Sequence, residues 1–274
     1  MAAELGSLGD VRRCAVLGSP IEHSLSPALH RAAYAHLGLN WIYDRVEVNE
    51  EQLAAFVCGL DTSWRGLSLT MPLKVAVLEL GEVDPLARLA GAGNTLVLEG
   101  GERWVYNTDV GGLTWAVRQV TTALVSRVTI LGAGATARAA LIAATELGAE
   151  QVTVVARTLS RAEQLRGLSQ SLGVELEIEP WGGLPDADLV VSTVVSGAAD
   201  TIAPVCDSAR LIVDVIYHPW PTVLAMAAER AGCTVVSGRD LLIGQALLQI
   251  ELMTGSRIPA DVLYAALESR EADR

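Results

Sequence analysis

The sequence predicts an α/β protein of two domains, in which strands alternate with helices and form parallel sheets. Three observations carry this prediction. The chain has 274 residues, and a domain commonly holds about 150 residues, so the length favours two domains. Short apolar runs alternate along the chain with amphipathic stretches, as they do in α/β folds. The composition also changes at residues 107–112, where the segment NTDVGG separates two such series of elements.

The elements of the first half follow from apolar runs and from residues that begin helices. Residues 14–18, CAVLG, are a short apolar run that ends at glycine and predict a buried strand. A helix begins at Ser26-Pro27 and ends before Gly38, because serine is a favoured N-cap and proline fits the first helical position. The other predicted elements are a half-buried strand over residues 41–48, a helix from Asn49 to Gly59, a strand from Arg65, a short helix that Pro72 opens and that holds Lys74, a helix from Asp84-Pro85, and a hairpin over residues 95–106 that turns at Gly100-Gly101.

The second half alternates strand and helix more regularly. Residues 113–120 form an amphipathic stretch that is expected to bridge the two domains. From residue 127 the order is strand, helix, strand, in the segments RVTILGAG, ATARAALIAATELG and QVTVVART. Further strands are predicted at residues 174–179, 188–193 and 211–216, and helices at residues 241–254 and 259–269.

The composition argues against several classes of protein. The chain has 20 basic and 32 acidic residues, a formal net charge of −12, so it repels the phosphates of nucleic acids and anionic lipids. No apolar run reaches the ~18 residues of a membrane span, and the N-terminus lacks the basic start and apolar stretch of a secretion signal. The cysteines and histidines have no CxxC or HExxH spacing, which argues against disulfides and metal sites and leaves a soluble, cytoplasmic, metal-free protein as the expectation. These residues are Cys14, Cys58, Cys206, Cys233, His23, His30, His36 and His218.

The segment ILGAGATA has the pattern of a phosphate-binding turn. Gly132, Gly134 and Ala137 stand as GxGxxA directly after a predicted strand and directly before a predicted helix. The first glycine allows the tight turn, the second lets the backbone approach a pyrophosphate, and the small third residue lets helix and strand pack closely. The free N–H groups of the helix N-terminus then bind the phosphates. The alternative is a helix-start turn in an α/β protein of another kind.

The end of the next strand indicates which dinucleotide binds. An NAD enzyme usually has Asp or Glu there, which binds the ribose hydroxyl. The segment VVARTLSR has no acid at this place, but Arg157, Thr158 and Arg161. Two guanidinium groups and a hydroxyl suit the additional 2′-phosphate of NADP, since arginine binds phosphate as a planar fork. In the alternative interpretation, both arginines are solvated surface residues.

Lys74 is the only lysine in the chain and lies in the segment SLTMPLK, at a predicted strand-to-helix corner. Asp109 lies in NTD, at the predicted joint between the domains. A lysine beside a carboxylate in a cleft can donate a proton to a substrate oxygen or remove one. By residue type alone this pair is weak evidence, because a structural salt bridge is the commoner arrangement of Lys and Asp.

Several motifs, in order along the chain, resemble those of the shikimate dehydrogenase family. LGSPIEHSLSPALH is similar to the family's opening substrate loop, and LTMPLK is similar to its lysine motif. AGAGNTL and YNTD resemble its asparagine and aspartate motifs, and GAGATARA and ART resemble its cofactor loops. VDVIY and GRDLLIGQAL resemble its closing elements, so the resemblance runs from about Cys14 to Gln249.

The resemblance implies the reversible reduction of 3-dehydroshikimate to shikimate with NADPH, a step of chorismate and aromatic amino-acid biosynthesis. It implies a substrate domain of residues 1–107, completed by C-terminal helices of residues 240–274, and a Rossmann-type NADP-binding domain of residues 108–239, with the active site in the cleft between them. Lys74 is implied as proton donor and acceptor, Asp109 as its partner, and no metal is implied. Substrate contacts are implied for Ser24, Ser26, Ser68, Thr70, Asn94, Asp109, Tyr217 and Gln245. Cofactor contacts are implied for Gly132, Ala133, Gly134, Ala135, Thr136, Arg157, Thr158, Arg161, Val215 and Gly238.

The chain departs from the family's pattern at a few positions. The family often has asparagine where this chain has Ser68 and Ala156, and a further glycine where it has Ala135. The stretch STVVSG replaces an asparagine–alanine–threonine pattern near the nicotinamide. Two alternatives remain open. An NAD-dependent quinate/shikimate dehydrogenase would be favoured by an acid after the second cofactor strand, and a non-catalytic dinucleotide-sensing protein by the loss of Lys74 or Asp109. A homodimer is an open alternative to a monomer.

Overall fold

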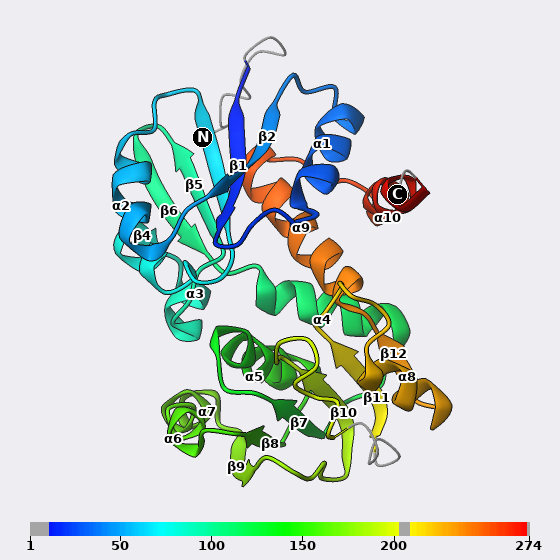
Figure 1. Ribbon diagram of the computed structural model, residues 1–274. Coiled ribbons are helices and arrows are strands. Elements are labelled where there is room, and N and C mark those ends of the chain that lie inside the picture. The colour runs from blue at the N-terminus through cyan, green and yellow to red at the C-terminus, as the bar shows by residue number, and fades with distance from the viewer. Residues whose placement is uncertain (1–10, 203–208, 273–274) are drawn as a thin grey trace. The chain divides into compact units, whose positions relative to one another are not determined.

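The structure, a computed structural model, describes residues 11–202 and 209–272. The chain divides into two compact units, Met1–Thr108 with Gln245–Arg274, and Asp109–Gly244, and each unit contains one six-stranded sheet (Figure 1). The predicted domain boundaries lie close to this division, while the ligand assigned to each domain remains a prediction. Cys206 and the N-terminal segment that was inspected for a secretion signal lie outside the described residues.

The first sheet combines parallel strands with a hairpin. Its strand order is β2-β1-β3-β5-β6-β4. The predicted parallel arrangement holds for β1 with β2 and β3, whereas β5 runs antiparallel to both β3 and β6. The hairpin turns at Gly100 and Gly101, whose φ angles of 60° and 86° suit glycine. The strands are β1 (Arg13–Gly18), β2 (Ile42–Glu47), β3 (Trp64–Leu69), β4 (Glu82–Val83), β5 (Thr95–Glu99) and β6 (Glu102–Tyr106).

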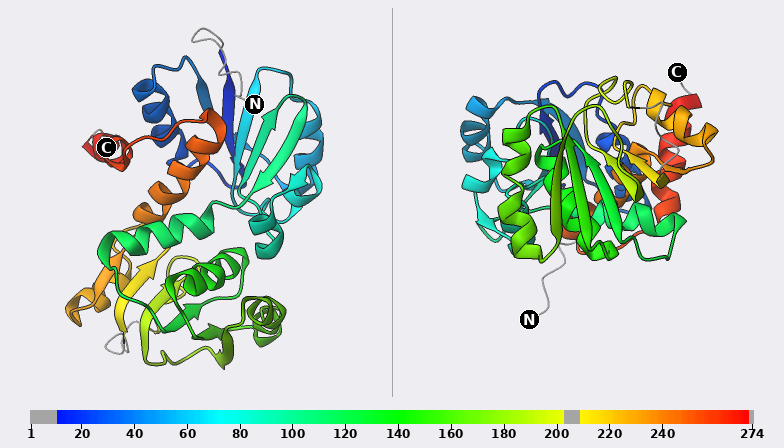
Figure 2. Two further views of the ribbon diagram at one scale, coloured as in Figure 1. Left: turned by 180° about the vertical axis from the view of Figure 1, so that it is seen from behind. Right: turned by 90° about the horizontal axis from the view of Figure 1, so that it is seen from below.

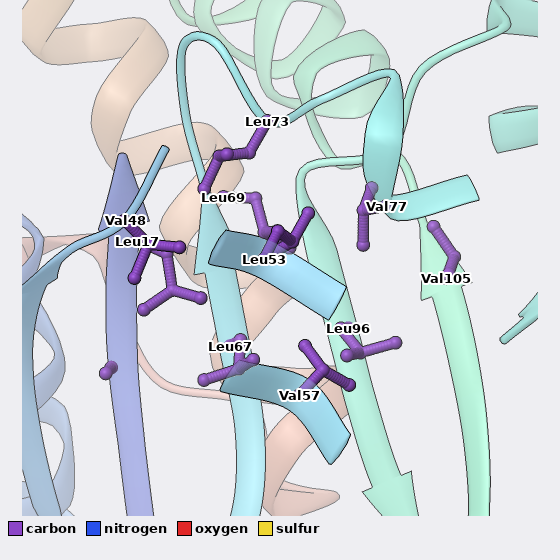
Figure 3. Packing of buried hydrophobic residues seen from close by; sticks show 11 residues of the cluster. Leu17, Val48, Leu53, Val57, Leu67, Leu69, Leu73, Val77, Leu96 and Val105 are labelled. Carbon is purple, nitrogen blue, oxygen red and sulfur yellow. The ribbon is translucent and has the colours of Figure 1, made fainter. Parts of the chain in front are cut away.

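Helices cover both faces of this sheet. Leu17, Leu67 and Leu96 of the sheet point toward Leu53 and Val57 of helix α2 in one apolar cluster (Figure 3). The alternate residues of β1 pack on the other face in a cluster with side chains from α1 and α9, because successive strand residues point to opposite faces. The helices are α1 (Ser26–His36), α2 (Glu50–Cys58), the 3₁₀ helix η1 (Ala76–Glu79), α3 (Pro85–Ala90), α9 (Gly238–Thr254) and α10 (Ala260–Ala272).

Two local predictions for the first unit are wrong. Ser26 is not an N-cap, because α1 begins at Ser26 itself and its backbone N–H donates to Ser24 Oγ at 3.3 Å. Pro72 does not open a helix, because Lys74 lies in a turn and η1 begins only at Ala76. The turn over residues 71–75 places Lys74 five residues after Leu69, where β3 ends.

The second sheet is parallel throughout and has the strand order β12-β11-β10-β7-β8-β9. Its green-to-yellow strands lie side by side in the right-hand view of Figure 2. The order reverses between β7 and β10, which is the topological switch point where sheets of this type bind dinucleotides. The strands are β7 (Arg127–Leu131), β8 (Gln151–Ala156), β9 (Glu175–Pro180), β10 (Ala187–Ser192), β11 (Ala209–Asp214) and β12 (Thr234–Val236).

The helices of the second unit include two that the sequence patterns missed, α7 and α8. Most of the segment NTDVGG, which was predicted to separate the two series of elements, is helical, because α4 begins at Asp109. Strand β11 ends at Asp214, two residues earlier than predicted, because the Asp214 carboxylate accepts a hydrogen bond from Ile216 N at 3.2 Å and turns the chain. The helices are α4 (Asp109–Val120), α5 (Ala135–Leu147), α6 (Leu159–Glu163), α7 (Arg166–Leu172) and α8 (Val223–Arg230).

Candidate active site

Backbone hydrogen bonds bring Thr70, Lys74 and Asn94 together at one edge of the first sheet. We call the turn of residues 71–75, which contains Lys74, the lysine turn. Thr70 N donates to Leu17 O at 2.9 Å, and this hydrogen bond connects the lysine turn to the end of β1. Lys74 O accepts from Gly93 N at 2.7 Å, one residue before Asn94. Leu69 N, at the end of β3, donates to Asn94 O at 2.8 Å. A hydroxyl, an amine and an amide therefore share one edge of this unit.

At the same edge of the sheet, the close packing of the chain requires glycine at position 18. A Cβ atom at Gly18 would lie 2.5 Å from Thr70 Cγ2 and 3.0 Å from Met71 O. The glycine that ends β1 therefore lets the lysine turn pack directly on the strand.

The Asn94 side chain is buried and bound to the chain that precedes Asp109. Asn94 is 2% exposed, its Oδ1 accepts from Thr108 N at 2.8 Å, and its Nδ2 donates to Thr108 Oγ1 at 2.9 Å. Asp109 follows Thr108, begins α4 and is buried. By the division of the chain, Asp109 and Tyr217 belong to the second unit.

Ser24 and Ser26 lie in the first unit, where the loop after β1 leads into α1. Ser24 is half-buried and its carbonyl O accepts from Arg45 Nε at 2.9 Å, which anchors the loop to β2. Ser26 is buried.

Gln249 is a buried polar residue of the first unit that the predicted set of site residues does not include. It is 1% exposed and hydrogen-bonds to both Ser68 and Asn94. Ser68 is also buried, at 3% exposed, and its proton is directed to Gln249. The signal in the sequence was the spacing: Gln249 follows Gln245 by four residues, so both lie on one face of α9.

In the second unit, the glycine-rich turn has two glycines with different physical requirements. Gly132 has φ 109°, and a Cβ there would lie 2.6 Å from Thr193 Oγ1. Thr193 in turn donates to Leu131 O at 2.7 Å, which joins the ends of β10 and β7. Gly134 has an ordinary φ of −97°, and no described atom lies within 4 Å of an added Cβ. The space beside Gly134 is open, as a backbone that a pyrophosphate approaches must be.

The N-terminus of α5 is suited to an anion. Gly134 is its N-cap and forms no side-chain cap hydrogen bond, and the first turn has no acidic residue. The partial positive charge of a helix of this length is therefore left for a ligand. Ala133, Ala135 and Thr136 belong to the same turn.

Arg157 and Thr158 lie between the end of β8 and the start of α6, and Arg161 lies in α6. All three side chains are exposed. Over the described residues, no acidic side chain forms an ion pair with Arg157 or Arg161, in contrast to Arg166, which pairs with Glu163. Both guanidinium groups can therefore bind an anionic ligand without first breaking an ion pair.

Val215 and Gly238 lie against each other after β11 and β12. A Cβ at Gly238 would lie 2.3 Å from Val215 O, so only glycine fits there. The adjoining segment, with Tyr217, is held by Asp214, a buried residue that the sequence patterns did not indicate. Asp214 Oδ2 accepts from Thr222 Oγ1 at 2.7 Å, and burial raises the pKa of this carboxyl.

Within residues 11–202 and 209–272, no group of three or more His, Cys, Asp or Glu side chains is arranged to hold a metal ion. No helix in this part of the chain is both long and apolar enough to span a membrane.

The chain is similar to known shikimate dehydrogenases. Residues 16–96 match the family model described as the shikimate dehydrogenase substrate binding domain. The chain is 36% identical over 267 residues to the shikimate dehydrogenase (NADP(+)) of Methanothermobacter thermautotrophicus, covering 92% of this chain and 94% of that protein. The crystal structure of Mycobacterium tuberculosis shikimate dehydrogenase matches with a TM-score of 0.88 and 38% identity, covering 94% of this chain and 99% of that one. The Thermus thermophilus enzyme in complex with NADP(H) and shikimate matches with a TM-score of 0.82 and 31% identity, covering 94% and 99% of the two chains.

Proposed function

The chain belongs to the shikimate dehydrogenase family, and from this membership we propose which of its residues bind the substrate, bind the cofactor and move the proton. The protein is an NADP-dependent oxidoreductase that reversibly reduces 3-dehydroshikimate to shikimate, a step of the shikimate pathway to aromatic amino acids. The observation that carries the proposal for the residues is the joining of Thr70, Lys74 and Asn94 at one sheet edge.

The substrate is a small carboxylated polyol, and the proposed contacts match its chemistry. Ser24 and Ser26 bind its carboxylate through hydroxyl donors. Its hydroxyl groups are held by neutral donors and acceptors, which bind a polyol without burying a charge. These are the side chains of Thr70, Asn94, Tyr217 and Gln245. Ser68 is buried and donates its hydroxyl proton to Gln249, so we propose that it helps to hold this part of the site in place.

Lys74 is proposed as the group that moves the proton. Reduction of the ketone leaves an alkoxide, and the ammonium group of Lys74 donates a proton to that oxygen. In the reverse direction the amine removes the proton of the shikimate hydroxyl. Asp109 is proposed as the carboxylate that orients Lys74 and a substrate hydroxyl. The lysine turn is rigidly placed by its bonds to β1 and Gly93.

The residues of the second unit fit NADP. When bound, NADPH supplies the hydride that reduces the ketone. The open space at Gly134 and the uncapped N-terminus of α5 would hold the pyrophosphate, with Gly132, Ala133, Ala135 and Thr136 forming the turn. The side chains of Arg157, Thr158 and Arg161 would hold the 2′-phosphate. Val215 and Gly238, which lie against each other, would lie near the nicotinamide.

A spectrophotometric assay that crosses NADP and NAD with shikimate and quinate tests the function. The highest kcat/KM is expected for NADP with shikimate. Highest activity with NAD and quinate would support the catabolic alternative instead. Absence of any turnover, with NADP still bound, would support the non-catalytic dinucleotide-sensing alternative.

Replacing each glycine of the turn by alanine tests the cofactor site. Gly134→Ala is expected to keep the melting temperature but to raise KM for NADP at least tenfold, because the added Cβ meets only the space proposed for the pyrophosphate. Gly132→Ala is the matched control and is expected to lower the melting temperature, since its backbone has φ 109° and its Cβ meets Thr193. The cofactor site is misplaced if Gly134→Ala binds NADP like the unmodified protein.

We also propose that the protein works in the cytoplasm, since Cys14 and Cys58 are free thiols. A homodimer stays an expectation, which light scattering in solution measures directly.

A further inference from the structure

A connected set of buried hydrogen bonds joins α9 to the sheet of the first unit. Gln249 Oε1 accepts from Ser68 Oγ at 2.9 Å and from His30 Nε2 at 3.3 Å. Gln249 Nε2 donates to Asn94 O at 3.1 Å and to Thr95 Oγ1 at 3.0 Å. Tyr43 OH donates to Ser68 Oγ at 2.6 Å. We call Tyr43, Ser68, Gln249, His30 and Thr95 the Gln249 network.

The donors and acceptors of this network have one consistent arrangement. The Asn94 carbonyl only accepts, so the amide NH₂ of Gln249 must face it and Oε1 must accept from the other side. Ser68 therefore donates to Gln249, and Tyr43 donates to Ser68. Thr95 Oγ1 accepts from Gln249 and donates to Asn94 Oδ1 at 3.0 Å. The network thus directs an O–H donor at the oxygen of the Asn94 amide.

A second donor binds the same oxygen of the Asn94 amide. Thr108 N, which only donates, also points at Asn94 Oδ1, at 2.8 Å. With its oxygen bound by Thr95 and Thr108, the Asn94 amide must present its NH₂ group on the other side. Rotation of the amide by 180° would place NH₂ against Thr108 N, which cannot accept a hydrogen bond. Such a mismatch leaves two buried N–H groups without an acceptor, which is unfavourable.

We infer that Gln249 is a positioning residue for the substrate: it holds the backbone of Asn94 directly and, through Thr95, the orientation of the Asn94 side chain. The inference rests on the proposed function, in which Asn94 contacts a hydroxyl of shikimate. Gln249 is 1% exposed, so it acts through Asn94 and does not touch the substrate itself.

The titratable groups around Gln249 stay uncharged near neutral pH. Burial lowers the pKa of His30, on α1, to about 3, so its Nε2 carries the proton of the neutral ring and donates it to Gln249. Burial raises the pKa of Tyr43, on β2, and raises the pKa of Cys14, on β1, to about 11. The β3 and β5 elements contribute the hydroxyls of Ser68 and Thr95, which do not ionise.

Gln249→Glu provides a pH-dependent test. An ionised carboxylate has no proton for Asn94 O, so KM for shikimate is expected to rise about tenfold at high pH. As the pH falls the buried carboxyl takes up a proton, its O–H donates to Asn94 O, and KM is expected to return toward that of the unmodified enzyme. Burial raises the pKa of such a carboxyl toward neutral pH, so the change lies in an accessible range. Gln249→Met, which has no donor at any pH, is expected to raise KM without this pH dependence.

Two measurements separate positioning from a loss of stability. Ile250→Val, at the next residue of α9, removes one methyl group from a fully buried side chain and does not touch the network. It is expected to lower the melting temperature and to leave KM for shikimate unchanged. In all Gln249 variants KM for NADP is expected to stay unchanged.

Thr95 gives a second and milder pair of variants. Thr95→Val removes the hydroxyl that joins Gln249 to the Asn94 side chain, whereas Thr95→Ser keeps it. KM for shikimate is expected to rise severalfold in Thr95→Val and to stay near that of the unmodified enzyme in Thr95→Ser. Equal values for both variants would overturn the inference, even if the Gln249 variants fail to fold.

Asn94→Ala distinguishes the inference from the function on which it rests. If Asn94→Ala leaves KM for shikimate unchanged, the proposed substrate site is wrong. If Asn94→Ala raises KM while Gln249→Glu keeps the KM of the unmodified enzyme at every pH, the site stands and the positioning role is wrong.

Discussion

Lys74→Ala is expected to lower kcat by about 10²–10⁴-fold, the usual contribution of a positioned proton donor and acceptor. KM for NADP is expected to remain near that of the unmodified enzyme, because the lysine turn lies in the first unit and the proposed cofactor residues lie in the second. Steady-state kinetics with shikimate and NADP, over a range of pH, measure both effects. Val75→Ala, the exposed neighbour in the chain, is the control and should keep its kcat.

A chemical experiment on the unmodified enzyme complements this variant. Because Lys74 is the only lysine in the sequence, an amine-selective reagent has one side-chain target. Modification is expected to abolish activity, and bound shikimate is expected to slow it. A Lys74→Ala enzyme with near-normal kcat at every pH would show that another group moves the proton.

Arg157→Ala is expected to raise KM for NADP at least tenfold and to change KM for NAD little. A charge-assisted hydrogen bond to the 2′-phosphate contributes roughly 1.5–3 kcal/mol, which corresponds to a tenfold or larger effect. NAD lacks this phosphate and so loses nothing when the guanidinium is removed. The ratio of kcat/KM for the two cofactors measures the change, and Arg161→Ala should act in the same direction.

Arg166→Ala is the matched control for the cofactor experiment. Arg166 also belongs to the second unit and is exposed, but its guanidinium pairs with Glu163. Its removal should leave the preference for NADP unchanged. Equal kcat/KM for NADP and NAD in the unmodified enzyme, or an equal loss for both in Arg157→Ala, would contradict the proposed 2′-phosphate site.

Local signals were sufficient for most elements of the fold. The Asn49 cap of α2, with Gln52 three residues later, forms the reciprocal pair of hydrogen bonds that begins the helix. Gly100 and Gly101 form the predicted hairpin turn. Elements without such signals were missed, among them β12, which has three residues, and η1, which replaced the helix expected at Pro72.

The sequence by itself determined most of the strands and helices and the glycine turn after β7, because these depend on residues close together in the chain, and it led to the hypothesis that Lys74 moves the proton. Only the tertiary structure showed that Gln249 hydrogen-bonds to Ser68 and Asn94. The bond from Gln249 to Asn94 joins residues 155 positions apart, and it exists because α9 packs against β3, where Gly66 leaves no room for a Cβ beside Met253. A hydrogen bond between distant residues depends on the distance and angle that packing sets between whole elements, and no local pattern of residue types contains that information.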